Sequence, residues 1–141
     1  MGTFFLRDLL SSDVKVEVMA SKSFLYPDLS VTCQAQDRTA TRFISHPCLI
    51  VEVLSPSTVR AASAFAEAYD RGDKFKLYRR SVSLQEYVLV STNDIAIDLY
   101  RRTERDRWEL ISYGAGDVVE LESVNLTFPI AQVFENITFS N

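Results

Sequence analysis

The segment Cys48–Ser55, Cys-Leu-Ile-Val-Glu-Val-Leu-Ser, constrains the fold of this chain more than any other. The near-continuous apolar and β-branched run from Leu49 to Leu54 predicts a central strand covered on both faces of a sheet. Glu52 interrupts this run. Burying an unpaired carboxylate costs on the order of several kcal/mol, so we expect something to compensate Glu52. The candidates are a cation shared with a second carboxylate, an ion pair, or a strand end that reaches solvent.

The size and charge of the chain narrow the class of protein. Its 141 residues, 47% hydrophobic and 24% charged, predict one soluble domain over residues 1–141. The net charge of −4 does not favour a polyanion, so a nucleic-acid partner would need a local basic patch or metal ions. The sequence lacks an apolar stretch approaching the ~20 residues of a membrane span. Charges at Arg7 and Asp8 come too early for a secretory signal, which favours a cytoplasmic protein without membrane contact.

The cysteine content argues against a structural metal site. Cys33 and Cys48 are the two cysteines, no CxxC motif occurs, and His46 is the single histidine, so a structural zinc site is not expected. We expect two free thiols in a reducing cytoplasm, each packed as a small buried hydrophobic residue. His46 precedes a proline and is expected in a surface loop rather than as a general base.

The pattern of apolar residues predicts an α+β fold. Alternation over 14–19 indicates a half-buried strand, and Pro27 can open a second strand before Leu29. Helix-forming residues over 61–80, broken at Gly72, predict the main crossover helix, at about residues 69–80. Residues 34–45 are expected to form a loop. The remaining elements are expected to be a C-terminal antiparallel meander with strands at 85–91, 95–101, 108–113 and 118–122, and a short closing helix at 129–134.

Two carboxylates and one lysine form a candidate site. Asp28 begins one predicted strand and Glu52 lies inside another, so the two can converge if these strands pair. Paired carboxylates with a backbone carbonyl suit Mg²⁺ or Mn²⁺, which would polarise a phosphodiester and activate water. Asp70, Lys74 and Tyr78 are spaced i, i+4, i+8 and share one helix face. Lys74 could therefore offer an ammonium group near the scissile phosphate.

Each of these residues also has a structural interpretation. Asp28 suits a turn after proline, and Glu52 could be a structural carboxylate in an ion pair. Lys74 could pair with Asp70 along an exposed helix face. Tyr78 is typical of a core residue with a solvated hydroxyl group.

The basic residues occur in two groups. The group along the predicted helix comprises Arg71, Lys74, Lys76, Arg79 and Arg80. The group around the predicted hairpin tip comprises Arg101, Arg102, Arg105 and Arg107. Either group could meet a phosphate backbone. Acidic residues are interleaved with both, which favours solvated surfaces of mixed sign.

Four sequence blocks occur together in a characteristic order. They are Tyr-Pro-Asp at 26–28, His-Pro-Cys-Leu-Ile-Val-Glu-Val-Leu-Ser-Pro-Ser-Thr at 46–58, Asp-Arg-Gly-Asp-Lys at 70–74 with Tyr78, and Gln-Glu-Tyr-Val-Leu-Val at 85–90. Over roughly residues 13–140 the chain resembles the bacterial Uma-two family of restriction-endonuclease-like proteins, within the PD-(D/E)XK nuclease superfamily. The resemblance implies a mixed sheet flanked by helices and metal-dependent hydrolysis of phosphodiesters.

The resemblance also assigns roles to individual residues. It makes Asp28 and Glu52 the two metal-binding carboxylates, with the backbone carbonyl of Val53 as a further ligand by analogy. The lysine that normally follows the second acid by two residues is replaced by Leu54. In this family the lysine role is assigned to the following helix, which implies Lys74, with Lys76 as a weaker candidate.

Two departures from the family pattern bear on activity. The acidic N-terminal hairpin and helix typical of the family are expected to be missing, and an Ala-rich insertion is expected over Val59–Glu67. Such an insertion could shift Lys74 relative to the carboxylates, and misplacement by ~1 Å can cost on the order of 10²-fold in rate. A sheet uncovered at one side would favour homo-oligomers or a partner.

Three functions are compatible with these residues and motifs. The first is a Mg²⁺-dependent nuclease that cleaves DNA, with Asp28, Glu52 and Lys74 as the catalytic residues. The alternative is a catalytically inactive binding or interaction protein that retains the fold. A third option is metal-dependent hydrolysis of another phosphodiester, such as RNA or a nucleotide.

Overall fold

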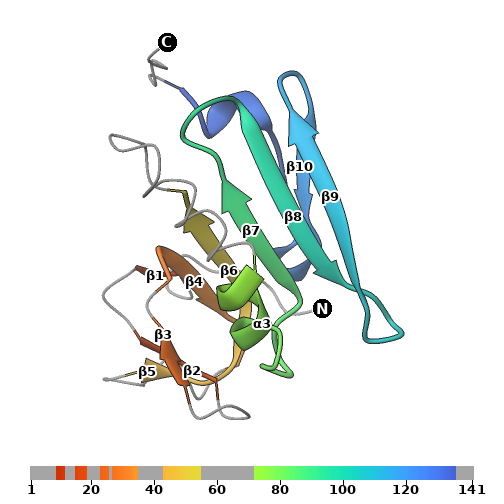
Figure 1. The fold of residues 1–141 in the computed structure, drawn as a ribbon. Coiled ribbons are helices and arrows are strands. Elements are labelled where there is room, and N and C mark those ends of the chain that lie inside the picture. Colours follow the sequence, from red (N-terminus) through yellow and green to blue (C-terminus); the bar gives the residue numbers. More distant parts are fainter. Residues whose placement is uncertain are drawn as a thin grey trace.

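A six-stranded mixed sheet forms the centre of the molecule (Figure 1). The computed structural model describes residues 9–11, 15–18, 23–25, 27–34, 43–54 and 72–135. The strand order across the sheet is β1-β4-β6-β7-β8-β9. These strands are β1 (Leu9–Ser11), β4 (Leu29–Thr32), β6 (Pro47–Val53), β7 (Glu86–Val90), β8 (Ala96–Arg102) and β9 (Trp108–Gly114).

Strand β6 is the predicted central strand, and its two neighbours run in different directions. It pairs antiparallel with β4 and parallel with β7. A parallel pair needs a crossover connection, and this crossover contains α3 (Lys74–Tyr78). The helix expected at 69–80 is thus confirmed over α3. Residues 55–71 lie outside the described residues; they include Asp70, Arg71 and the expected insertion at Val59–Glu67. The antiparallel pairing β7-β8-β9 confirms the first three strands of the predicted meander.

Both faces of the sheet are covered, as the apolar run of β6 predicted. Ile50 is 0% exposed and packs on the face of α3, together with Phe75 and Tyr78. Leu49, 3% exposed, packs on the opposite face with residues of the C-terminal segment, including Val119. Figure 1 shows α3 in front of the sheet and β10 behind it.

The C-terminal segment differs from the prediction in its strands and in its closing helix. β10 (Val118–Leu121) leaves the main sheet and pairs antiparallel with β11 (Leu126–Pro129), a strand that the sequence pattern did not predict. A 3₁₀ turn, η3 (Glu122–Val124), joins the two strands and ends at Asn125, whose φ of 54° is left-handed. The expected closing helix at 129–134 is only a 3₁₀ turn, η4 (Ile130–Gln132).

A small three-stranded sheet has the order β3-β2-β5. Its strands are β3 (Ser23–Leu25), β2 (Lys15–Val18) and β5 (Phe43–Ile44). β2 confirms the strand predicted at 14–19, and β5 lies inside the predicted loop at 34–45, of which residues 35–42 lie outside the described part. β1, β3 and β5 have two or three residues each, too few for alternation to identify them.

The prediction of two free, buried thiols was wrong. Cys33 and Cys48 form a disulfide, with their Cα atoms 5.8 Å apart. Cys33 directly follows β4, and Cys48 lies near the start of β6. The antiparallel pairing of these strands brings the two residues together, a consequence of strand register that their spacing of 15 residues does not encode. Cys48 is 4% exposed, as expected, but Cys33 is exposed.

Candidate functional site

Glu52 has a positively charged partner. Its side chain, 3% exposed, lies on the α3 side of the sheet, and Lys74 Nζ lies 2.8 Å from Glu52 Oε2. Lys74 is itself 17% exposed, so the ion pair is largely shielded from water. A buried carboxylate is stabilised by such a cation, which explains how the charge is tolerated in an apolar strand.

Tyr78 binds the other oxygen of the same carboxylate. Its hydroxyl group donates a hydrogen bond to Glu52 Oε1 at 3.4 Å, and its side chain is 0% exposed. Lys74 and Tyr78 are four residues apart and therefore face Glu52 from the same side of α3. The core interpretation of Tyr78 accounts for its burial, but its hydroxyl group contacts the site rather than solvent.

Asp28 lies at the same end of β6. Leu29 is opposite Val51 in the β4-β6 ladder, so the preceding Asp28 is beside the end of β6. Its Oδ2 accepts a hydrogen bond of 2.7 Å from the backbone N–H of Val53. Asp28 is exposed, whereas Glu52 is buried, so the two carboxylates are in different environments.

The backbone carbonyl of Val53 faces the same side as Asp28. The N–H of Leu54 donates to Val90 O at 2.9 Å, toward β7. Because a trans peptide holds its C=O and N–H in opposite directions, the Val53 carbonyl points away from β7 and toward the side of β4. The Thr92 hydroxyl group holds the next carbonyl, Leu54 O, at 2.7 Å. Val53 is 44% exposed, so this strand end is open to solvent.

The structure therefore places the predicted residues at the same end of the neighbouring strands β4 and β6, where Asp28 contacts the Val53 amide and Lys74 contacts Glu52. Asp28, Glu52 and the Val53 carbonyl are oxygen donors, a set that fits Mg²⁺ or Mn²⁺, which prefer few protein oxygens and retain water. Among the described residues, no group of three or more His, Cys, Asp or Glu side chains could hold a metal ion. A cation at this strand end would therefore take the Val53 carbonyl as a third protein donor beside the two carboxylates. Lys76, the weaker lysine candidate, is exposed.

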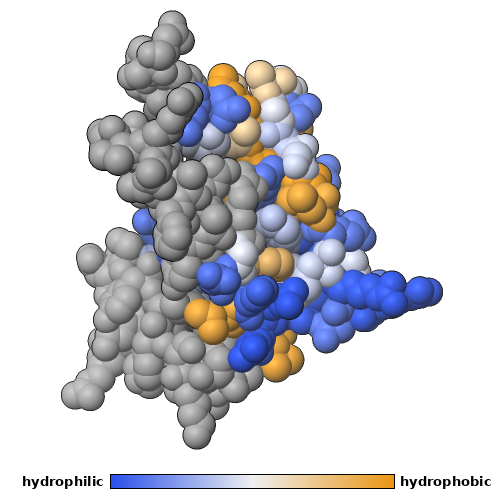
Figure 2. Space-filling view, in the orientation of Figure 1, coloured by the Kyte–Doolittle hydropathy of each residue, from blue (hydrophilic) through white to orange (hydrophobic). Residues whose placement is uncertain are grey.

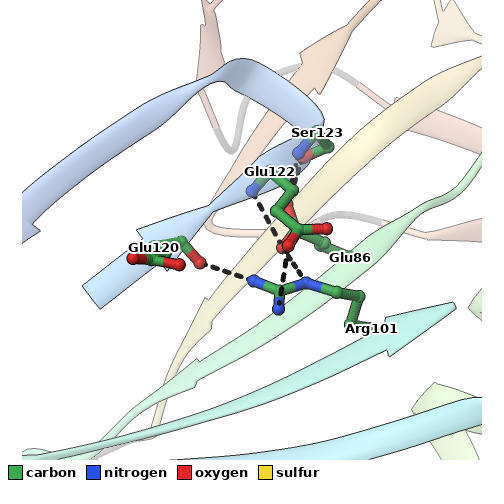
Figure 3. Close-up of polar contacts among 5 residues, drawn as sticks. All are labelled: Glu86, Arg101, Glu120, Glu122 and Ser123. Atoms are coloured by element: carbon green, nitrogen blue, oxygen red, sulfur yellow. Dashed lines mark hydrogen bonds and ion pairs between the residues drawn. The ribbon is translucent and has the colours of Figure 1, made fainter. Parts of the chain in front are cut away.

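A second buried carboxylate, Glu86, lies at the start of β7 and was not among the predicted site residues (Figure 3). It is 1% exposed and accepts hydrogen bonds from the backbone N–H groups of Glu122 and Ser123, at 3.2 and 2.7 Å. Arg101 Nε also donates to it, at 3.0 Å, while Arg101 Nη2 donates to Glu120 O. This cluster connects β7 and β8 to β10 and η3. Its sequence signal was the same as for Glu52, a carboxylate beside an apolar strand run.

The pKa of Arg101 reflects these contacts. Burial alone would lower it, but the hydrogen bond and negative charge of Glu86, with the charge of Glu122, raise the pKa above its ordinary value. Arg101 therefore stays charged, and the cluster is a fixed structural ion pair.

The β8-β9 hairpin tip is hydrophilic (Figure 2). Arg102 lies over the Trp108 ring, 4.6 Å from its centroid, pairs with Asp106, and donates to Leu84 O and Ser81 O. The guanidinium group of Arg102 is thus engaged in contacts within the protein. The exposed residues 104–107 alternate in sign, as the mixed-surface interpretation predicted.

Comparison with known proteins identifies the family. The sequence matches the family named Uma2, "Putative restriction endonuclease", over residues 5–131. The chain belongs to the Uma2 family. The resemblance predicted from the four sequence blocks is thereby confirmed.

Two relatives of this Uma2 chain come from Synechocystis sp. (strain ATCC 27184 / PCC 6803 / Kazusa), and both are uncharacterized proteins. One is 43% identical over 129 residues, covering 92% of this chain and 64% of the relative. The other is 29% identical over 117 residues, covering 82% of this chain and 61% of the relative. The chain thus spans less than two thirds of the length of these relatives.

A solved structure confirms the predicted fold class. The crystal structure of a "putative nuclease belonging to DUF820" from Anabaena variabilis ATCC 29413 superposes with a TM-score of 0.59 at 16% identity, covering 92% of this chain and 69% of that one. At this identity the likeness concerns the fold, the restriction-endonuclease-like α+β sheet. Among the described residues of the Uma2 chain, the helices are too short or too polar to cross a membrane.

Proposed function

We propose that this Uma2 chain is a metal-dependent nuclease that hydrolyses phosphodiester bonds in DNA. One observation carries the proposal: the buried Glu52 carboxylate contacts Lys74 at 2.8 Å, and the next amide along the strand is held by Asp28 at 2.7 Å. A purely structural ion pair would explain Glu52 and Lys74. It would not require a second carboxylate on the adjoining exposed amide.

The residues divide the chemistry between them. Asp28, Glu52 and the Val53 carbonyl would hold Mg²⁺ or Mn²⁺, which when bound supplies Lewis-acid activation of water and of the phosphodiester. Lys74 places an ammonium group at the same carboxylate, where it can stabilise the charge that develops on the phosphate. Tyr78 orients Glu52 through its hydroxyl group.

The substrate follows from charge and from the family. A chain of net charge −4 does not attract nucleic acid as a whole, so binding would depend on the metal and on local cations at the site. The family description, "Putative restriction endonuclease", supports DNA rather than RNA as the substrate. The exposed Val53 end of β6 would leave room for a phosphate backbone to approach.

Calorimetric titration with Mn²⁺ and Mg²⁺ tests the proposed site. We expect saturable binding by the unaltered protein and its loss in both Asp28→Asn and Glu52→Gln. Plasmid cleavage should be abolished in the same two variants, while circular dichroism stays unchanged. Glu109→Gln, a matched change at an exposed position of β9, should leave binding and cleavage intact.

Two results would contradict the proposal. Full cleavage by Glu52→Gln would remove Glu52 from the metal site. Absence of binding at millimolar metal would favour the alternative, a fold-retaining interaction protein whose Glu52-Lys74 pair is structural. Parallel assays on single-stranded DNA and RNA would distinguish DNA from the other phosphodiester substrates.

A further inference from the structure

A cavity of about 470 Å³ lies at the opposite end of β6 from Glu52. The Cys33-Cys48 disulfide forms part of its wall, beside Gln34 and Gln85. Its volume falls within the range of about 300–1,000 Å³ that is typical of small-molecule sites. The cavity is therefore large enough to hold a peptide of a few residues beside the disulfide.

The arginines of the cavity wall are already paired with acidic groups. Arg101 is bound by Glu86 and Glu122, and Arg102 is bound by Asp106 and by backbone carbonyls. These arginines consequently offer little surplus charge for binding a phosphate. The disulfide in the same wall is a group that can react by thiol exchange.

The two sulfur-bearing residues differ in accessibility. Cys33 is exposed, while Cys48 is 4% exposed and packs within the apolar core on the C-terminal side of the sheet. A thiolate must approach the sulfur that it attacks, so exchange should be directed to Cys33.

We propose that the Cys33-Cys48 disulfide is a thiol-exchange site for small peptide thiols of the glutathione type, and that Cys33 is the residue modified. The attacking thiolate forms a new S–S bond to Cys33, the Cys33-Cys48 bond breaks, and Cys48 leaves with the electron pair and takes up a proton. A second thiolate then attacks the mixed disulfide, which releases oxidised thiol and leaves Cys33 reduced. Two thiols are oxidised to one disulfide for each protein disulfide reduced.

The exchange would affect the end of the sheet where Asp28 lies. The disulfide joins the residue after β4 to the start of β6, while Asp28 directly precedes β4 and Glu52 lies near the other end of β6. The ladder between them is short and irregular between Val31 and Thr32, next to Cys33. Opening the bond should loosen β4 and with it the contact of Asp28 with the Val53 amide. This consequence rests on the proposed function, whereas the thiol chemistry does not.

Peptide mapping by mass spectrometry tests the modification independently of cleavage. Protein purified in air should contain no titratable thiol when denatured. Native protein treated briefly with reduced glutathione and quenched with acid, before the second exchange, should carry a single glutathione adduct on Cys33. In single variants, the Cys33 thiol left by Cys48→Ser should react with a thiol reagent at least about tenfold faster than the Cys48 thiol left by Cys33→Ser. Circular dichroism of both variants checks that they fold.

Filling the cavity mouth gives a second test that retains the disulfide. Gln34→Trp should slow exchange with glutathione several-fold, and Gln132→Trp, at an exposed position in η4 outside the cavity wall, should not. Free thiols in the air-purified protein, an adduct chiefly on Cys48, or equal rates for the two tryptophan variants would each overturn the proposal. Normal exchange in a protein without metal binding would contradict the proposed function alone.

Discussion

Glu52 and Glu86 are the same residue type in adjacent strands, yet their surroundings suit different roles. Glu86 accepts backbone N–H groups and an arginine that is bound in turn by a backbone carbonyl, so its position is fixed by the fold. Glu52 is contacted by the side chains of Lys74 and Tyr78, which come from one short helix. Side-chain partners can rearrange when a substrate or cation arrives, which suits a functional carboxylate.

Glu86→Gln should therefore reduce stability rather than chemistry. Removing this charge leaves Arg101 without its buried counterion, so we expect the free energy of unfolding to fall by about 2–4 kcal/mol. Urea denaturation followed by circular dichroism measures the change. A loss below about 0.5 kcal/mol would contradict the structural role, because that is the range of ordinary surface substitutions.

The raised pKa of Arg101 predicts how the destabilisation by Glu86→Gln responds to pH. A cation whose pKa is raised on folding contributes its full stability below its unfolded pKa and loses it only as the pH rises through the folded pKa. The destabilisation by Glu86→Gln should thus stay constant from about pH 6 to pH 9, far below arginine titration. A marked decline of this destabilisation between about pH 6 and pH 9 would show that the ion pair with Arg101 is not its cause.

At the scale of the element, α3 is too short to be stable alone. Its five residues fall well below the roughly 12–15 that an isolated helix needs. Packing holds it in place: Phe75 is stacked against Tyr87, with ring centroids 5.2 Å apart, and contacts Trp108 edge-on. This aromatic cluster is what places Lys74 at Glu52.

Lys74→Met should separate the role of the charge from that of packing. Methionine keeps the apolar stem of lysine but removes the ammonium group, so we expect cleavage to fall by about 10²–10³-fold, as for other electrostatic groups at reacting centres. Lys76→Met, on the same helix but exposed, should keep full activity. Fluorescence of Trp108, the single tryptophan, reports whether α3 remains docked in both variants. Equal activities would remove Lys74 from the mechanism.

At the scale of the whole molecule, the sheet is stabilised from both sides by apolar packing. The aromatic cluster beneath α3 covers one face, and β10, β11 and η4 cover the other. A fold supported in this way should not depend on the metal that the proposed activity requires.

A chelator should thus abolish activity without unfolding the protein. With excess EDTA we expect no detectable plasmid cleavage. The thermal midpoint should change by less than about 2 °C, because a metal ion that occupies few of the folded molecules adds little to their stability. Differential scanning calorimetry with and without EDTA provides the measurement. A fall of the midpoint by roughly 10 °C would indicate that the metal is structural.

Features that depend on local pattern could be predicted from the amino-acid sequence. The continuous apolar run of β6 predicted a strand covered on both faces, and alternation with turn residues predicted β7, β8 and β9. The four sequence blocks predicted the family, and through it the candidates Asp28, Glu52 and Lys74. Periodicity and motif spacing are properties of neighbouring residues, so one chain suffices to detect them.

The contacts between residues far apart in the sequence depended on the tertiary fold. It paired Glu52 with Lys74 and Tyr78, bound Asp28 to the Val53 amide, and joined Cys33 to Cys48, where free thiols were expected. In the tertiary structure β10 also pairs with β11 outside the main sheet, and Glu86 meets the backbone of Ser123. Each of these depends on strand register and on how a crossover helix packs, and these follow from burial of the whole core rather than from any local stretch.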